Sequence, residues 1–232
     1  MKPIIGIVLA AGSSLRMRSE KVKPLIEIGG KTIVEHSLTV LENCDALHGY
    51  ILVVEKSKIK SYRDHLLGQG SVFRRLLDIV SGGSPRQESV YSGLMTLDET
   101  TEAVLVHDVA RPCVDKNTLE ASIHGCSQYD AVISAIPSAD TMKIVNDGVV
   151  KVTPDRSTVW GAQTPQTFRY KVLRTAHEQA QKDSFVGTDD AELVERAGYM
   201  VRVLKGSPDN IKVTVPEDLD IAEHILRRQG RI

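Results

Sequence analysis

Four basic side chains follow a turn of small residues near the N-terminus, in the stretch VLAAGSSLRMRSEKVKPL over residues 8–25. The small residues at 12–14 let backbone N–H groups approach a ligand closely, and a nest of such donors suits phosphate oxygens. Arg16 adds a planar fork and Lys23 a compact positive charge, so the pair could cradle a triphosphate and stabilise developing negative charge. The stretch is neither a P-loop nor a dinucleotide-binding fingerprint, and the alternative is a solvated basic surface.

A second glycine-rich stretch reads VSGGSPRQESVYSGL over residues 80–94. Gly82 and Gly83 follow an expected strand and precede an expected helix, whose first turns would carry Ser89. Backbone groups in such a loop could bind the edge of a base or a sugar. The pattern alone is more typical of an ordinary strand–helix loop.

Asp108 is the third candidate, at the end of the apolar run in VLVHDVARPCV, residues 104–114. A carboxylate is costly to bury at such a place unless it is paired or bound to a metal. Arg111 could be its partner, or a Mg²⁺ ion could bridge Asp108 and phosphate groups. We interpret the neighbouring His107 as a hydrogen-bonded structural histidine rather than a base.

These residues need a scaffold, and the hydrophobic pattern supplies one. Short runs rich in β-branched residues predict strands buried on both faces, at 4–9, 50–55, 103–108 and 131–136. Amphipathic stretches between them predict helices, at 32–43, 57–68, 86–97 and 117–127. The alternation predicts an α/β fold with a doubly wound, mostly parallel sheet, which binds ligands outside the carboxyl ends of its strands.

The segment from 140 to 160 breaks the alternation and predicts a β-hairpin arm. Asp147-Gly148 is a type I′ turn signal between MKIV and VVKV. A lone hairpin is marginally stable in water, so we expect it to pack on its own sheet or on a partner subunit. Further elements are expected in the C-terminal part: helices over 169–182 and 189–197, strands over 200–204 and 211–214, and a last helix with Pro216 in its first turn.

Composition limits the classes of protein. The 232 residues are 41% hydrophobic and 25% charged, with a net charge of −1, which is typical of a globular chain and argues against nonspecific binding to nucleic acid or a membrane surface. No apolar run approaches the length of a membrane span. The N-terminal apolar run is short for a signal peptide and is better explained as a buried strand. Three widely spaced cysteines form neither a disulfide framework nor a zinc pattern, and a cytoplasmic location fits.

The motifs taken together resemble one family along almost the whole chain. They are LAAGSSLRM, GGSPRQESVYSGL, HDVARP, DTMK, DRSTVWGAQTPQTF, TDDAELVERAG and GSPDNIKVTVPEDLDIAE. These closely resemble the 2-C-methyl-D-erythritol 4-phosphate cytidylyltransferases of the non-mevalonate isoprenoid pathway. The resemblance implies one nucleotidyltransferase domain over residues 1–232, CTP and a polyol phosphate as substrates, and a Mg²⁺ or other divalent cation. It also implies a homodimer in which the arm, 140–160, of each subunit reaches over its neighbour.

The resemblance also implies roles for single residues. Arg16 and Lys23 would stabilise the transition state at the α-phosphate, and Asp108 would lie next to Mg²⁺. CTP would be bound by the first loop and the second glycine-rich stretch, through Ala10, Ala11, Gly12, Ser13, Ser14, Gly82, Gly83, Arg86 and Ser89. The polyol phosphate would be held by Arg156, Lys212, Thr141 and Thr188, with support from Arg111. The chain departs from the family's usual pattern at Ser13-Ser14-Leu15, Val22-Lys23-Pro24 and Ser84-Pro85.

Three other activities are alternatives to this one. A ribitol 5-phosphate cytidylyltransferase would share the fold and the CTP site, but TDDAELVERAGYMVRVLKGSPDN looks more like the methylerythritol enzymes. A dinucleotide-binding oxidoreductase lacks support because there is no G-x-G-x-x-G. A catalytically silent nucleotide sensor is disfavoured by the presence of both Arg16 and Lys23.

Overall fold

The computed structural model of the chain describes residues 2–12, 22–68 and 70–232. Its central sheet has the strand order β11-β7-β10-β6-β1-β4-β5. In chain order these strands are β1 (Ile4–Leu9), β4 (Gly49–Val54), β5 (Leu76–Ser81), β6 (Ala103–Asp108), β7 (Ala131–Pro137), β10 (Trp160–Arg169) and β11 (Val201–Lys205). All pairings in this sheet are parallel except the two that β10 makes, with β6 and β7. The predicted mostly parallel sheet is confirmed.

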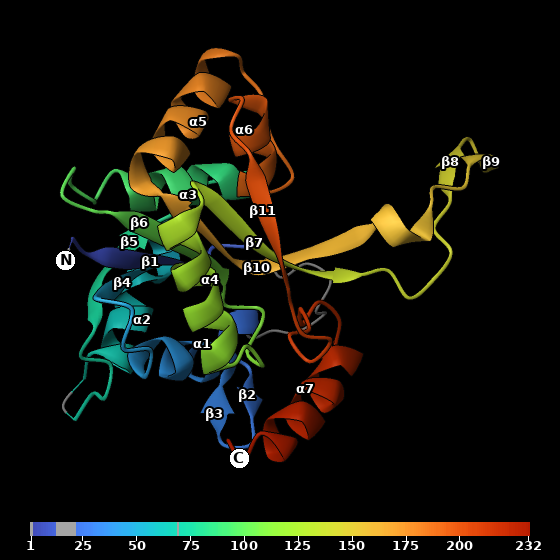
Figure 1. Cartoon of the computed structure of the whole chain (residues 1–232). Coiled ribbons are helices and arrows are strands. Elements are labelled where there is room, and N and C mark those ends of the chain that lie inside the picture. The colour runs from blue at the N-terminus through green and yellow to red at the C-terminus, as the bar shows by residue number, and fades with distance from the viewer. Residues whose placement is uncertain (1, 13–21, 69) are drawn as a thin grey trace.

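Helices cover both faces of the sheet, as Figure 1 shows. One face carries α1 (Ile33–Glu42), α2 (Ile59–Leu66), α4 (Lys116–Gln128) and α7 (Glu217–Arg228), and the other carries α3 (Arg86–Leu94), α5 (Tyr170–Lys182) and α6 (Asp190–Arg196). The alternation of side chains along β1 explains the two layers, because Ile5 and Ile7 pack into one core and Val8 into the other. This is the doubly wound arrangement that the sequence predicted.

The chain enters α1 through a small hairpin. The 3₁₀ turn at Lys23–Leu25 is followed by β2 (Glu27–Ile28) and β3 (Lys31–Thr32), which pair antiparallel. Thr32 then caps α1, accepting a hydrogen bond from the backbone N–H of Glu35 while the Glu35 carboxylate accepts from the backbone N–H of Thr32. The cap fixes where the chain turns from the N-terminal loop into the helix layer.

The structure adds one central strand that the hydrophobic pattern does not predict. β10 lies between β6 and β7, and its register shifts between Gln163 and Gln166. Pro165 falls in that interval and cannot donate a ladder hydrogen bond, which accounts for the interruption. The N-terminal half of β10 pairs with the end of β7, so both strands run from the sheet toward the arm.

The arm is a hairpin of β8 (Ile144–Asn146) and β9 (Val149–Val152). Its turn residues Asp147 and Gly148 have φ of 48° and 76°, as the predicted type I′ turn requires. A 3₁₀ turn at Arg156–Thr158 then leads back into β10. In Figure 1 the hairpin stands away from the rest of the chain, so within one chain it does not pack on the sheet.

One expected strand is absent: residues 211–214 are not part of any sheet. Their alternating apolar and polar side chains suit an extended segment, but the backbone N–H of Val213 donates to the carbonyl of Ala110 in a loop. The segment instead runs beside the loop that follows β6 and leads to Pro216, the N-cap of α7. Among the described residues, no helix is long and apolar enough to span a membrane.

Candidate functional site

A cleft of about 230 Å³ lies at the carboxyl edge of the sheet, beside the end of β6 and the start of α3. Residues from five separate segments line it, among them five that the sequence singled out: Arg86, Asp108, Arg111, Thr188 and Lys212. The cleft also has Gln163, Thr164 and Gln166 from β10, and Asp189. The wall therefore combines three cationic side chains, two carboxylates and several neutral hydrogen-bonding groups.

Asp108 is held between two cations rather than by the arginine three residues ahead. Its Oδ1 lies 3.1 Å from Nε of Arg86, and its Oδ2 lies 2.6 Å from Nζ of Lys212. Arg111 instead donates to the backbone carbonyls of Asn210, at 2.7 Å, and Ala162, at 3.4 Å. Of the two alternatives for Asp108, the ion pair with Arg111 is wrong, because the Arg111 guanidinium is turned toward these carbonyls.

The environment keeps Asp108 ionised. Burial by itself would raise the pKa of this carboxyl, but the charges of Arg86 and Lys212 lower it well below its usual range. His107, which is fully buried, has its pKa lowered to about 4 by desolvation. Its Nδ1 lies 3.2 Å from Oγ1 of Thr164, and it is neutral at physiological pH, which fits the interpretation as a structural histidine.

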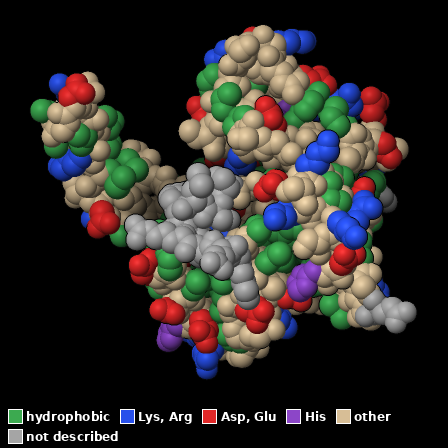
Figure 2. Space-filling view, turned by 180° about the vertical axis from the view of Figure 1, so that it is seen from behind, with side chains coloured by type: hydrophobic (Ala, Val, Ile, Leu, Met, Phe, Trp, Pro, Cys, Tyr) green, Lys and Arg blue, Asp and Glu red, His purple; other side chains and the backbone are tan. Residues whose placement is uncertain are grey.

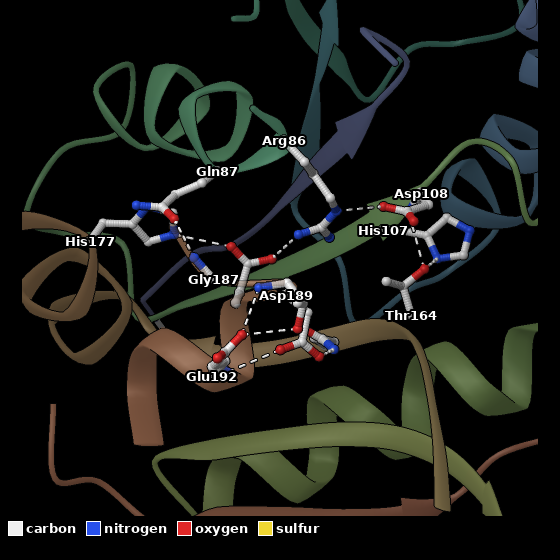
Figure 3. Close-up of polar contacts among 12 residues, drawn as sticks. Arg86, Gln87, His107, Asp108, Thr164, His177, Gly187, Asp189 and Glu192 are labelled. Carbon is white, nitrogen blue, oxygen red and sulfur yellow. Dashed lines mark hydrogen bonds and ion pairs between the residues drawn. The ribbon is translucent and has the colours of Figure 1, made fainter. Parts of the chain in front are cut away.

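Arg86 has a second carboxylate partner that sequence reasoning missed. Its Nη1 lies 2.6 Å from Oδ2 of Asp190, the first residue of α6, and the other oxygen of Asp190 lies 3.0 Å from Nε2 of His177 in α5. In Figure 3, Arg86 points toward Asp108, and His177 lies on the opposite side of Arg86 from Asp108. Asp190 stood in the motif TDDAEL, but 104 residues separate it from Arg86, so no local pattern pairs them.

The glycine-rich loop before α3 is tightly packed. A Cβ at Gly82 would lie 2.5 Å from Oγ of Ser89 and 2.9 Å from Cβ of Ala11. The Ser89 hydroxyl accepts from the backbone N–H of Gly83 at 3.2 Å and donates to its carbonyl at 2.9 Å. Glycine is therefore required at 82, and this packing brings the loop against the end of β1.

The N-terminal loop is described in part. Ala10 is buried and its N–H donates to Val53, whereas Gly12 is exposed. Lys23 follows the loop, and its Nζ donates to the carbonyl of Val213 at 3.2 Å, next to Lys212. Three of the predicted site residues, Ser13, Ser14 and Arg16, lie outside the described residues.

Comparison with known proteins decides the family. The chain matches the sequence model of the family described as "IspD: 2-C-methyl-D-erythritol 4-phosphate cytidylyltransferase" over residues 4–228. The chain belongs to this family.

Two relatives and one solved structure illustrate the similarity. The 2-C-methyl-D-erythritol 4-phosphate cytidylyltransferase of Clostridioides difficile strain 630 is 40% identical over 225 residues, covering 97% of this chain and 94% of the relative. That of Syntrophus aciditrophicus strain SB is also 40% identical and covers both chains completely. The crystal structure of 4-diphosphocytidyl-2C-methyl-D-erythritol synthase from Anaerococcus prevotii DSM 20548 superposes with a TM-score of 0.85 at 33% identity, covering 98% and 99% of the two chains.

In this cytidylyltransferase, two of the residues that the family resemblance assigns to substrate binding lie away from the cleft of their own chain. Thr141 and Arg156 are both exposed on the arm, and the Arg156 guanidinium donates to the carbonyl of Ala139 at 3.5 Å. Neither lines the cleft. The arm itself is apolar, with Ile144, Val149 and Val150 between 53% and 58% exposed. Figure 2 shows hydrophobic side chains over the surface of this projecting arm.

The donor groups suit a divalent cation carried by a nucleotide better than a closed metal site. Among the described residues, no three histidine, cysteine or acidic side chains are grouped to hold a metal. Mg²⁺ commonly takes one or two protein carboxylates and completes its shell with phosphates and water. Asp108 is ionised and lies at the carboxyl end of β6, so it fits as a single ligand of this kind.

Proposed function

We propose that the protein transfers the cytidylyl group of CTP to the phosphate of 2-C-methyl-D-erythritol 4-phosphate, releasing pyrophosphate and forming 4-diphosphocytidyl-2-C-methyl-D-erythritol. The observation that carries this function is the family match over residues 4–228, which spans every strand of the sheet that bears the cleft. The cleft adds chemical support, because Arg86, Arg111 and Lys212 line it and suit phosphorylated ligands.

The reaction needs charge and positioning more than proton transfer. An oxygen of the polyol phosphate forms a bond to the α-phosphorus of CTP while the bond from that phosphorus to the pyrophosphate oxygen breaks. A phosphate monoester is already mostly ionised at neutral pH, so no general base is required. This agrees with a buried, neutral His107. Catalysis then rests on alignment and on neutralising the charge that develops.

The residue roles are part of the same proposal. Arg16 and Lys23 stabilise the charge at the α-phosphate. CTP is bound by the N-terminal loop at 10–14 and by the loop and helix start that carry Gly82, Gly83, Arg86 and Ser89. Lys212 holds the polyol phosphate, with Thr188 and Arg111 beside it. The position of Lys23 next to residue 213 supports this, because it brings a nucleotide-side cation close to a substrate-side cation.

We further propose a homodimer with exchanged arms, built on one nucleotidyltransferase domain over residues 1–232. Arg156 and Thr141 then act in the cleft of the neighbouring subunit, and the neighbour covers the exposed apolar arm. The exposed apolar side chains of the hairpin support this, because water-exposed groups of this kind favour a partner surface.

A Mg²⁺ ion belongs to the proposal as well, with Asp108 as its protein ligand. When bound, it would neutralise phosphate charge and help to align the triphosphate. The compartment we propose is the cytoplasm, since all three cysteines are unpaired and buried, as suits a reducing environment.

The test is pyrophosphate release from CTP and Mg²⁺ with two polyol phosphates in separate reactions. We expect turnover with 2-C-methyl-D-erythritol 4-phosphate and little with ribitol 5-phosphate. Product identity is checked by mass spectrometry. If the purified, folded protein releases pyrophosphate with ribitol 5-phosphate but not with 2-C-methyl-D-erythritol 4-phosphate, the proposed substrate is refuted. If it releases none with either polyol phosphate, the proposed activity is refuted.

A further inference from the structure

Asp190 is a buried carboxylate outside the cleft that nevertheless connects to it. Its side chain is 1% exposed and it is not among the residues that line the cleft. It belongs to a row of contacts that runs from His177 through Asp190, Arg86 and Asp108 to Lys212. Burial would raise the pKa of Asp190, but Arg86 and His177 lower it, so the carboxylate is charged.

The geometry divides one guanidinium between two carboxylates. Arg86 uses Nη1 for Asp190 and Nε for Asp108, and the contact with Asp108 is the longer, at 3.1 Å against 2.6 Å. An arginine with a single carboxylate neighbour commonly donates two parallel N–H hydrogen bonds, one to each oxygen of the carboxylate. Here that arrangement is prevented, and the second oxygen of Asp108 is left to Lys212.

We propose that Asp190 is a positioning residue, which holds Arg86 so that only one oxygen of Asp108 is taken and the other remains for Lys212 and for a cation that accompanies CTP. This inference rests on the proposed function, since it assigns Asp108 to the nucleotide–metal side of the cleft. Asp190 contacts no substrate in this scheme and acts through Arg86.

A merely structural role can be separated from this one. The start of α3 is docked on the segment before α6 by a second contact, the side-chain amide of Gln87. This amide donates to the carbonyl of Phe185 at 3.1 Å. It also accepts from the N–H of Gly187 at 3.0 Å (Figure 3). Gln87→Ala therefore loosens the same two segments without changing a charge.

The experiment measures the dissociation constant of CTP with Mg²⁺ by titration calorimetry, without the polyol phosphate, together with kcat and KM for pyrophosphate release. Four variants are compared: Asp190→Asn, Arg86→Gln, the double variant, and Gln87→Ala. We expect Asp190→Asn to weaken Mg²⁺–CTP binding by about 10- to 100-fold, as for loss of one charge-assisted contact. Gln87→Ala should change it by less than about threefold, as for a neutral contact. The double variant should bind no more weakly than Arg86→Gln alone.

Three results would overturn the inference in proteins that unfold cooperatively. They are wild-type binding by Asp190→Asn, an equal loss in Gln87→Ala, or a loss from Asp190→Asn that persists undiminished when Arg86 is already replaced. If Asp190→Asn does not fold, Asp190→Glu takes its place, since it keeps the charge and shifts the carboxylate by one methylene. Binding by that variant should fall by more than about threefold, and unchanged binding refutes the inference. Failure of the proposed function is distinct, because then the wild-type protein itself releases no pyrophosphate.

Discussion

The arm gives a prediction that depends on two subunits. Arg156 is exposed on the arm and does not line its own cleft, whereas Lys23 lies next to the cleft residue Lys212. If arms are exchanged, each site takes Lys23 from one chain and Arg156 from the other. A dimer of one Lys23→Ala chain and one Arg156→Ala chain then has one site with neither change and one site with both. Each parent alone should be nearly inactive, with kcat for Lys23→Ala lower by about 10²–10³.

The expected recovery follows from counting sites. Each mixed dimer has one intact site of two, so purified mixed dimers should recover about half of wild-type turnover. That is well above the activity of Lys23→Ala alone, which would be roughly 0.1–1% of wild type. The chains are co-expressed with different affinity tags, and doubly tagged dimers are purified before pyrophosphate release is measured.

The matched control pairs Lys23→Ala with Lys212→Ala. Both residues lie in the body of the same chain, so every site in a mixed dimer keeps one defect and no recovery is expected. Recovery in this control would point to revertant or wild-type contamination. Verified mixed dimers of Lys23→Ala and Arg156→Ala that stay as inactive as their parents would show that Arg156 does not act across the interface.

Further predictions concern the arm, the base and a buried histidine. Deleting residues 144–151 should give a monomer by analytical ultracentrifugation that still binds CTP but scarcely turns over; a deleted protein that remains dimeric argues against the arm as the interface. CTP should be preferred over UTP by at least about tenfold in kcat/KM, because a site matched to the cytosine amino group leaves buried groups unpaired against uracil; equal values would contradict the base assignment at 82–89. The pKa of His107 is lowered to about 4 in the folded chain, whereas an unfolded histidine takes up its proton near pH 6.5. As the pH falls from about 6.5 to about 4, only the unfolded chain gains this proton, so the free energy of unfolding should fall by about 3 kcal/mol. Urea unfolding at several pH values should show that the free energy of unfolding of His107→Gln falls less with decreasing pH than that of the wild type. Identical pH dependences in the two proteins would show that His107 does not contribute.

Local pattern was sufficient for the strands that are buried on both faces. The four apolar runs predicted from the sequence lie within one residue of β1, β4, β6 and β7 at each boundary. The hairpin turn was equally predictable, since an Asp-Gly pair between alternating β-branched residues leaves few other conformations. In both cases neighbours in sequence determine the structure.

β10 shows why a central strand can lack the expected pattern. Its buried residues Gln163, Gln166 and Thr167 are polar, and distant groups accept from the two amides: the Gln163 N–H donates to the carbonyl of Ser207 and the Gln166 N–H to the carboxylate of Asp189. A polar run is stable in the middle of a sheet only when such partners exist. Since those partners come from segments 23 or more residues away, the sequence around β10 holds no sign of them.

The same distance limit applies to the charges of the cleft. Asp108 was recognisable as a carboxylate needing a partner, and the nearest candidate in sequence was Arg111. Its actual partners lie 22 and 104 residues away, at the start of α3 and in the 206–216 loop, and both reach the end of β6. Pairing by proximity in sequence failed because the topology, not the local chain, sets which cations reach the end of β6.

The buried charges of this cleft are better explained by positioning than by stability. Removing a charged pair from water costs free energy that its attraction often fails to recover, so an apolar replacement of similar shape is commonly no less stable. Yet Asp190 is completely enclosed, Asp108 nearly so, and Arg86 lies between them. Such a row gives one property that apolar packing cannot: each charged group has a fixed direction and a fixed partner. A reaction driven by alignment and charge neutralisation depends on that property, because fixed charges hold the substrate in the reactive geometry. We therefore expect replacements in this row to alter ligand binding and turnover, and not only the free energy of unfolding.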